Sequence, residues 1–196
     1  MHLLRYAREQ DDPKANALKR RKDKERALVS IDKLKEELKV QNERHKIVMS
    51  RLARSKGDWF NSPDAHKSAA ADAMNSFLQY CIFPRCVFSP ADAVFCARFV
   101  QQTHAQGTPY FSTLQYYDKL LRDVSVHIFC CTERQAQNLG RFLKESLSLL
   151  LHWKSDESIY NEECAKLPGF SKSFEQVDQR KASYQEFVKV VFKWYV

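Results

Sequence analysis

The sequence predicts an all-α protein in which a long charged N-terminal helix, a possible coiled coil, precedes an antiparallel helical-repeat or solenoid segment. Alternating strand patterns are absent from the chain. Apolar residues instead recur at helical spacing between short breaks made of Pro, Gly and helix-capping residues. No Pro or Gly interrupts the stretch between Pro13 and Gly57. Helices joined by short connections are typical of bundles and helical repeats.

Charge divides the chain into an arm and a body. The 196 residues carry a net charge of +8, and residues 1–56 hold 17 Lys and Arg against 9 Asp and Glu. The remaining residues are balanced, and Tyr6 is the only aromatic residue before Trp59. A segment without large apolar side chains cannot bury a core of its own. We therefore expect a disordered or frayed terminus over 1–15, a long basic helix or coiled-coil arm over 16–57, and a helical-repeat body over 62–196.

The arm carries a heptad pattern, which we call the arm seam. Its residues are separated alternately by four and three positions, the spacing of a coiled coil, and six of the eight are apolar. The seam consists of Ala27, Ile31, Leu34, Leu38, Gln41, His45, Val48 and Leu52. Gln41 and His45 weaken its middle. A helix of about 40 residues would be roughly 60 Å long.

Capping signals divide the body into about six helices. Ser62-Pro63 and Ser89-Pro90 are typical of helix starts. Thr132 with Gln135, and Ser183 with Glu186, have the spacing of capping boxes. The expected helices cover 64–80, 90–106, 112–128, 132–151, a short stretch within 155–167, and 183–196.

Two further expectations concern particular segments of the body. Residues 81–88, CIFPRCVF, form a loop in this prediction because Pro84 interrupts the pattern. The last residues, FVKVVFKWYV, lack a helix stop signal, so we expect the body to be truncated at 196.

The six cysteines do not have the spacing of a metal site. Cys81, Cys86 and Cys96 are separated by four and nine residues, whereas zinc sites use pairs such as C-x2-C. No signal peptide precedes them, so free thiols are expected. Cys81 and Cys96 have the pattern of small buried apolar residues. A catalytic Cys–His pair remains an alternative, because the histidine has to be close to the cysteine only in space and not in sequence.

Catalytic and phosphate-binding motifs are absent from the sequence. The four glycines stand apart from one another, so no glycine-rich loop can form. We therefore predict no catalytic residue, no cofactor site and no metal site. No apolar run approaches the roughly 20 residues that span a bilayer. Gly140, inside a helical pattern, indicates a close contact between helices.

The exposed members of one set of body residues are predicted to contact protein partners. Aromatic and arginine side chains dominate the energetics of interfaces. For Arg98 and Arg141, internal pairing with acids such as Asp92 or Glu133 is the favoured alternative. The set consists of Arg85, Arg98, Lys119, Arg122, Arg141, Trp153 and Lys154.

The basic cluster at the start of the arm has three interpretations. It is a solvated helix surface, one face of a coiled coil, or a contact to nucleic acid through sequence-independent attraction to phosphates. The candidate contacts to nucleic acid are Lys19, Arg20, Arg21, Lys22, Lys24 and Arg26.

Six short blocks occur in an order that resembles a known family. They are IFPR (82–85), DAVFCARF (92–99), TPYFSTL (108–114), CTERQAQNLGRFL (131–143), W-x2-D-x3-Y-x3-C (153–164) and PGF (168–170). Together they resemble the THO complex subunit 2 family, the large scaffold subunits of the THO/TREX messenger-RNA export complex.

The resemblance implies a nuclear, non-enzymatic scaffold segment from the central helical-repeat region of such a subunit. It implies docking of other THO complex subunits and of a DEAD-box RNA helicase, in a process that couples transcription to messenger-RNA packaging and nuclear export. No membrane partner is expected. The alternative is a stand-alone RNA-binding module that acts through residues 14–56. A cysteine enzyme is the third hypothesis.

Overall fold

The computed structural model describes residues 13–60, 69–171 and 180–195, and within these ranges the predicted all-α class is confirmed. The ranges contain helices, no strand and one isolated β-bridge between Ser171 and Lys181. The chain separates into two compact units, residues 1–53 and 54–196, which are described separately. The Ser62-Pro63 cap and residues 1–12 of the terminus predicted over 1–15 lie outside the described residues, and residues 13–15 belong to a helix.

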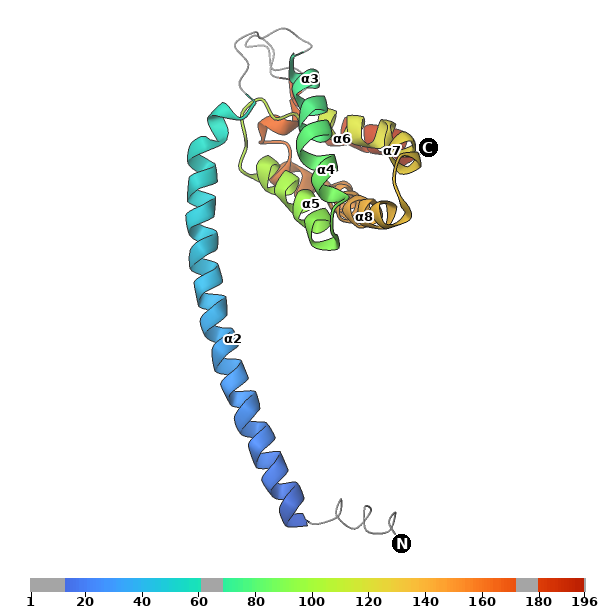
Figure 1. The fold of residues 1–196 in the computed structure, drawn as a ribbon. Helices are drawn as coiled ribbons and strands as arrows, with labels where there is room; N and C mark the ends of the chain where they lie inside the picture. The colour runs from blue at the N-terminus through green and yellow to red at the C-terminus, as the bar shows by residue number, and fades with distance from the viewer. Residues whose placement is uncertain (1–12, 61–68, 172–179, 196) are drawn as a thin grey trace. The chain divides into compact units, whose positions relative to one another are not determined.

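The arm forms one helix, α2 (Pro13–Ser55), as predicted (Figure 1). Its 43 residues contain no Gly and no Pro after the first position, so its backbone hydrogen bonds are uninterrupted. At 1.5 Å per residue the helix is about 65 Å long. Its seam side chains from Ala27 to Val48, Leu34 and Leu38 among them, are exposed, and Leu52 is half-buried. The coiled coil itself stays a prediction.

The body begins with a short 3₁₀ helix, η1 (Lys56–Asp58), followed by one helix with a wide middle turn. That helix consists of α3 (Ala69–Ser76), the π-helical η2 (Phe77–Ile82) and α4 (Phe83–Cys86). The loop predicted around Pro84 is therefore wrong. A proline ring normally collides with the carbonyl group four residues earlier, and a π turn provides extra room just before it.

The remaining helices follow the predicted order, and their caps form as expected. Ser89 Oγ accepts a hydrogen bond from the Asp92 N–H at 3.1 Å, and Thr132 and Gln135 form the reciprocal capping box. The predicted 112–128 helix is broken at Asp123. The elements are α5 (Pro90–Ala105), α6 (Thr113–Arg122), α7 (Val124–Phe129), α8 (Glu133–Ser155), α9 (Glu157–Glu163), the 3₁₀ helix η3 (Pro168–Phe170) and α10 (Tyr184–Tyr195).

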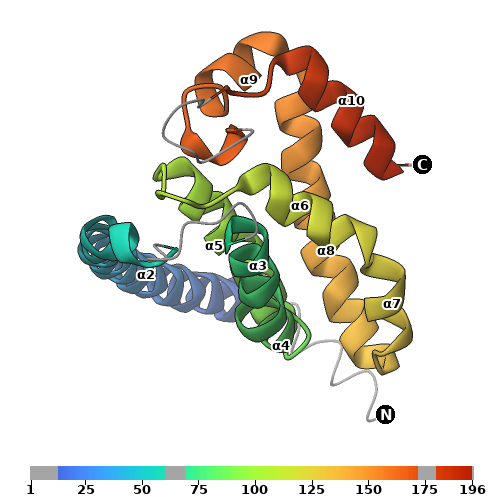
Figure 2. The ribbon, with the colours of Figure 1, turned by 90° about the horizontal axis from the view of Figure 1, so that it is seen from above.

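Contacts along α5 show how this helix runs relative to its neighbours. The Cys96 thiol at the middle of α5 reaches the Ile82 carbonyl, and Asp92 pairs with Arg85, so α5 runs against η2 and α4. In contrast, α5 and α8 run in the same direction (Figure 2). Asn138 donates to the Val87 carbonyl at one end, and Trp153 packs on His104 at the other. Helix α5 therefore packs against an antiparallel neighbour, η2–α4, and a parallel neighbour, α8, and the longer repeat stays a prediction.

The core of the body is rich in aromatic rings from several helices. The largest fully buried side chains include Trp153, Tyr116, Tyr117, Tyr160, Phe111, Phe142, Phe170 and Phe187. Phe170 lies 5.4 Å from Tyr160 and 5.7 Å from Trp153, edge to face in both cases. Each such ring contributes roughly 2–3 kcal/mol through burial, which accounts for a stable body around short helices.

A buried histidine joins α5, α6 and α9 inside this core. His104 Nε2 lies 3.1 Å from the Glu163 carbonyl, so Nε2 carries the proton, and Nδ1 accepts from the Thr113 hydroxyl at 2.8 Å. Burial lowers the pKa of His104 to about 4, which keeps the ring neutral. Gly169 packs directly against this pair. A Cβ atom there would lie 2.1 Å from Thr113 Oγ1 and 2.9 Å from His104 Nδ1.

Two predictions about small residues are corrected. Cys96 is buried as predicted, but Cys81 is exposed. The residues of this helix that face the core follow one another at intervals of four, Met74, Leu78, Ile82 and Cys86, and Cys81 falls outside that line. The close contact predicted at Gly140 is also wrong, since a Cβ atom there would meet nothing within 4 Å.

Replacing the two helical glycines with alanine should therefore have opposite effects on the stability of the body. Gly140→Ala should raise the free energy of unfolding by about 0.5–1 kcal/mol, because it lowers the entropy of the unfolded chain without a clash. Gly169→Ala should lower it by about 1–3 kcal/mol, because Thr113 must leave His104. Urea denaturation of both variants measures the difference. Equal effects at the two positions would contradict this account.

His104 should make the stability of the body depend on pH. In the unfolded chain its pKa is near 6.5, whereas burial lowers it to about 4 in the fold, so the unfolded chain takes up the proton first. The free energy of unfolding is therefore unaffected by this group above pH 6.5. It falls by roughly 3 kcal/mol as the pH decreases from 6.5 to 4. Denaturation at several pH values should show this slope, and His104→Asn should flatten it. An unchanged slope in the variant would show that His104 is not the titrating group.

Candidate interaction surface

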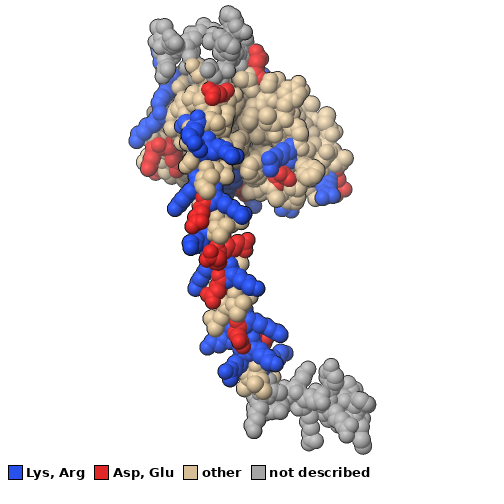
Figure 3. All heavy atoms as spheres, turned by 60° about the vertical axis from the view of Figure 1, so that its left-hand side comes forward, with Lys and Arg blue, Asp and Glu red and all other residues tan. Residues whose placement is uncertain are grey.

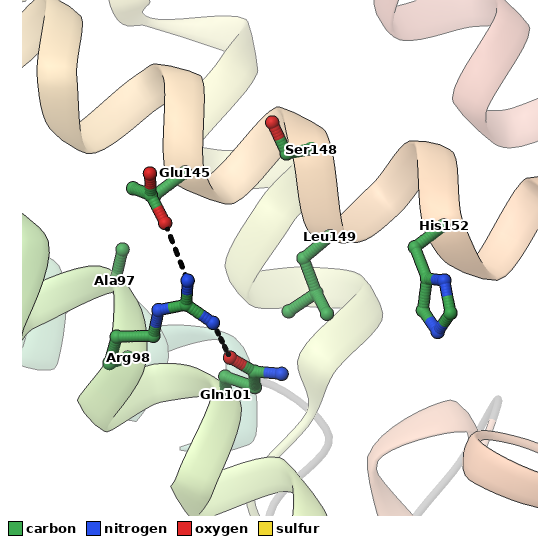
Figure 4. Close-up of a pocket in the computed structure, with 7 residues that line it drawn as sticks. All are labelled: Ala97, Arg98, Gln101, Glu145, Ser148, Leu149 and His152. Carbon is green, nitrogen blue, oxygen red and sulfur yellow. Dashed lines mark hydrogen bonds and ion pairs between the residues drawn. The ribbon is translucent and has the colours of Figure 1, made fainter.

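A polar groove runs between the parallel helices α5 and α8 (Figure 4). It has a volume of about 240 Å³. Arg98 lines one end of it, where Nη2 donates to Glu145 at 2.9 Å and Nη1 donates to Gln101 at 3.2 Å. The groove is lined by Ala97, Arg98, Gln101, Glu145, Ser148, Leu149 and His152.

The internal pairing predicted for Arg98 is confirmed, but its partner differs from the acids named. The acid is Glu145 on α8, not Asp92 or Glu133. Arg98 and Glu145 lie near the midpoints of their helices and face each other across the groove. The Arg98 side chain is 64% exposed, so this ion pair contributes at most about 1 kcal/mol and leaves the guanidinium accessible from solvent.

Four side chains form a continuous row, which we call the α5 ladder: Trp59, Phe99, Phe95 and Arg85. Phe95 and Arg85 are exposed, and Trp59 and Phe99 are half-buried. Neighbouring ring centroids are 6.1 and 6.0 Å apart, and the Arg85 guanidinium carbon lies 4.2 Å above the Phe95 ring. Arg85 also donates to Asp92 at 2.9 Å. Hydrogen bonds from Ser89 and then from Arg85 lower the pKa of Asp92, which stays ionised beside the guanidinium.

Sequence reasoning missed Phe95 and Trp59 as members of this surface. The available signal was the buried stripe of α5, which follows Ala93, Cys96, Ala97 and Val100 at helical spacing. Phe95 lies off that stripe, and its side chain is 48% exposed. A large ring on the polar side of an amphipathic helix is an indication of a contact surface.

A second groove, of about 420 Å³, lies between η2–α4 and the helices α6 to α8. The Phe83 ring packs 3.9 Å from His127 in its wall. Burial lowers the pKa of His127, although the nearby Asp123 opposes the shift. The predicted contact residue Lys119 also lines this groove. Its lining therefore mixes apolar side chains with polar ones, and Lys119 and Asp123 carry opposite charges there.

The other predicted contact residues are not brought together. Trp153 is 1% exposed and donates through Nε1 to Glu163 at 2.9 Å, so it is a core residue and cannot belong to the exposed set. Arg122 pairs with Asp118 on α6. Lys154 is half-buried. Arg141 is exposed on α8, one turn before Glu145.

The predicted nucleic-acid contacts all lie on the first half of α2. On the face drawn in Figure 3, blue basic side chains follow the arm, with fewer acidic ones between them. The six residues Lys19, Arg20, Arg21, Lys22, Lys24 and Arg26 are exposed. Arg26 is 3.9 Å from Asp23, a loose surface pair.

The buried thiols of the body are poor nucleophiles. Burial raises the pKa of Cys86 to about 12 and raises the pKa of Cys164 as well, so both stay protonated near neutral pH. No group of three His, Cys, Asp or Glu side chains in the described ranges could hold a metal ion. In the same part of the chain, every helix is too short or too polar to cross a membrane.

Comparison with known proteins identifies relatives of the whole chain. The model of the family described as "Transcription factor/nuclear export subunit protein 2" matches residues 2–196. THO complex subunit 2 of Arabidopsis thaliana is 43% identical over 186 residues, 94% of this chain and 10% of that protein. The human THO complex subunit 2 is 42% identical over 185 residues, 90% of this chain and 11% of that protein.

A more distant relative covers part of the chain. THO complex subunit 2 of Saccharomyces cerevisiae is 31% identical over 86 residues, 43% of this chain and 5% of that protein. No solved structure matches. The chain spans about a tenth of the length of the plant and mammalian relatives. Because the family model and the relatives cover nearly the whole chain at more than 40% identity, this chain belongs to the THO complex subunit 2 family.

Proposed function

We propose that this chain is a non-enzymatic scaffold segment of the THO complex in the nucleus. It holds other subunits of the complex and docks a DEAD-box RNA helicase, and so couples transcription to messenger-RNA packaging and export. The α5 ladder is the observation that carries the docking part of the proposal. The names of the family and its relatives, which describe a nuclear export subunit and a complex subunit, support the THO complex and the nucleus as its place of action.

The α5 ladder has the composition of an interface hot spot. Trp and Arg are enriched at such sites, and a partner that covers the Phe95 ring would desolvate both the ring and the guanidinium above it. The row is rigid, because Phe99 packs against both Phe95 and Trp59. A rigid row loses little side-chain entropy on binding, which favours affinity.

The groove beside the ladder adds a polar rim. Arg98 and Glu145 present both charge signs at the edge of the α5 surface. Interfaces commonly surround an aromatic centre with such a rim, which fixes orientation more than it adds affinity. We therefore assign the protein-binding face to α5 and the adjoining edge of α8.

RNA binding through the arm is a second candidate function. It is favoured by the six basic residues between Lys19 and Arg26 within a helix whose side chains are exposed. Backbone phosphates attract such a cluster regardless of sequence. This activity is compatible with scaffolding, since the cluster lies on α2 and the ladder lies on the body.

Phe95→Ala should weaken binding to a purified DEAD-box helicase, or to reconstituted THO subunits, at least tenfold. The loss of a hot-spot ring typically costs more than 1–2 kcal/mol. Isothermal titration calorimetry with the full chain measures the effect, and urea denaturation shows that the fold is kept. Phe192→Ala, a similarly exposed ring on α10, is the matched control. No binding by the folded wild-type chain, or equal losses in both variants, would refute the assignment.

Neutralising the basic cluster should remove RNA binding. Replacing Lys19, Arg20, Arg21, Lys22, Lys24 and Arg26 with Gln deletes up to six phosphate contacts, so the slope of log K against log salt should become shallower by about 4 for single-stranded RNA. Fluorescence anisotropy at several salt concentrations provides the slope. Replacing Lys33, Lys35 and Lys39, further along the same helix, is the control. An unchanged slope after the first set of replacements would exclude the cluster as the site.

A further inference from the structure

The arm seam takes no part in the two functions proposed above. Four of its apolar side chains are exposed on α2: Ile31, Leu34, Leu38 and Val48. Leu34 is 63% exposed and Leu38 is 61% exposed. These values differ sharply from those of the apolar stripes of the body, whose members are almost completely buried.

The spacing of the seam fits one particular kind of partner. Residues at alternating intervals of four and three stay on one side of a helix only if that helix winds around another one. Each apolar side chain covered in this way contributes roughly 1.5–3 kcal/mol. The stretch from Ile31 to Val48 therefore provides more than two heptads of surface suited to a second helix.

The charge of the arm disfavours a second copy of this chain as that helix. Residues 13–55 hold 14 Lys and Arg against 6 Asp and Glu, so two copies would bring +8 against +8. The charged residues that flank the seam in its middle heptads are Lys35, Glu37 and Arg44. In a parallel, in-register pair of copies, Glu37 would face Asn42 and Arg44 would face Met49. Neither would meet an opposite charge across the interface.

We propose that the arm seam binds an amphipathic helix with acidic flanks, supplied by another protein, in a two-stranded coiled coil. Asp or Glu beside the partner's apolar seam would pair with Lys35 and Arg44 and would offset the excess positive charge. Gln41 and His45 interrupt the apolar line, and a polar side chain opposite them fixes the register at some cost in affinity. This inference rests on the proposed scaffold function for the source of the partner, which is another subunit of the assembly.

The probe for this proposal is a synthetic helix of four heptads with Ile and Leu in the seam and Glu at the flanking positions. It should bind the full 196-residue chain with 1:1 stoichiometry in sedimentation and anisotropy measurements. The double variant L34N/L38N should weaken binding at least tenfold. The matched control is V29N/I47N, because Val29 and Ile47 are also exposed, at 50% and 68%, but lie outside the seam. Its affinity should stay within about twofold of the wild type.

A second probe with Lys at the flanking positions tests the charge requirement and should bind at least tenfold more weakly. The proposal is overturned if both double variants lose binding equally, if the two probes bind alike, or if the chain forms a dimer that L34N/L38N dissociates. Failure here is distinguishable from failure of the scaffold function. The seam variants change only α2, whereas retention of helicase or THO subunits by the body is measured through Phe95.

Discussion

The hydrogen bonds of His104 hold together the parts of the body on which its surface depends. The imidazole connects the end of α5 to the start of α6 and to the carbonyl end of α9. Trp153 of α8 and Phe170 of η3 pack on its ring at 4.8 and 5.3 Å. A neutral ring that satisfies both nitrogens avoids the cost of a buried unpaired polar group. Through these contacts α5 is fixed beside α8, and the groove and the α5 ladder keep their geometry.

Much of the fold could be predicted from the sequence because its signals are local. Ser89, Thr132 and Ser183 form the caps that their spacing indicates, and the arm is helical where no Gly or Pro interrupts it. The π turn before Pro84 could not be predicted, because its register depends on Leu78 and Ile82 both facing the core. The same holds for Gly140 and Gly169, since only packing shows which of them has a neighbour.

The candidate surface was harder to predict than the fold. Among the predicted contact residues, Arg85 and Arg98 are exposed, whereas Trp153 lies inside the core. Composition alone cannot distinguish an interface tryptophan from a core tryptophan, because both are large and amphipathic. The ladder joins Trp59 to Phe99 across 40 positions of sequence, and such a pairing appears only when the chain has folded. By contrast, the arm seam is a local pattern, so its heptad spacing can be read from the sequence alone.

The parallel arrangement of α5 and α8 constrains how the body folds while it is being synthesised. These helices are neighbours in space, yet α6 and α7 lie between them in the chain. While the polypeptide emerges from the ribosome, the stripe that includes Cys96 and Val100 has no complete cover until α8 has left the exit tunnel. Non-local contacts of this kind delay folding and leave apolar surface open to misassembly. We therefore expect the region from α4 to α8 to fold as one cooperative unit, only after α8 has been synthesised.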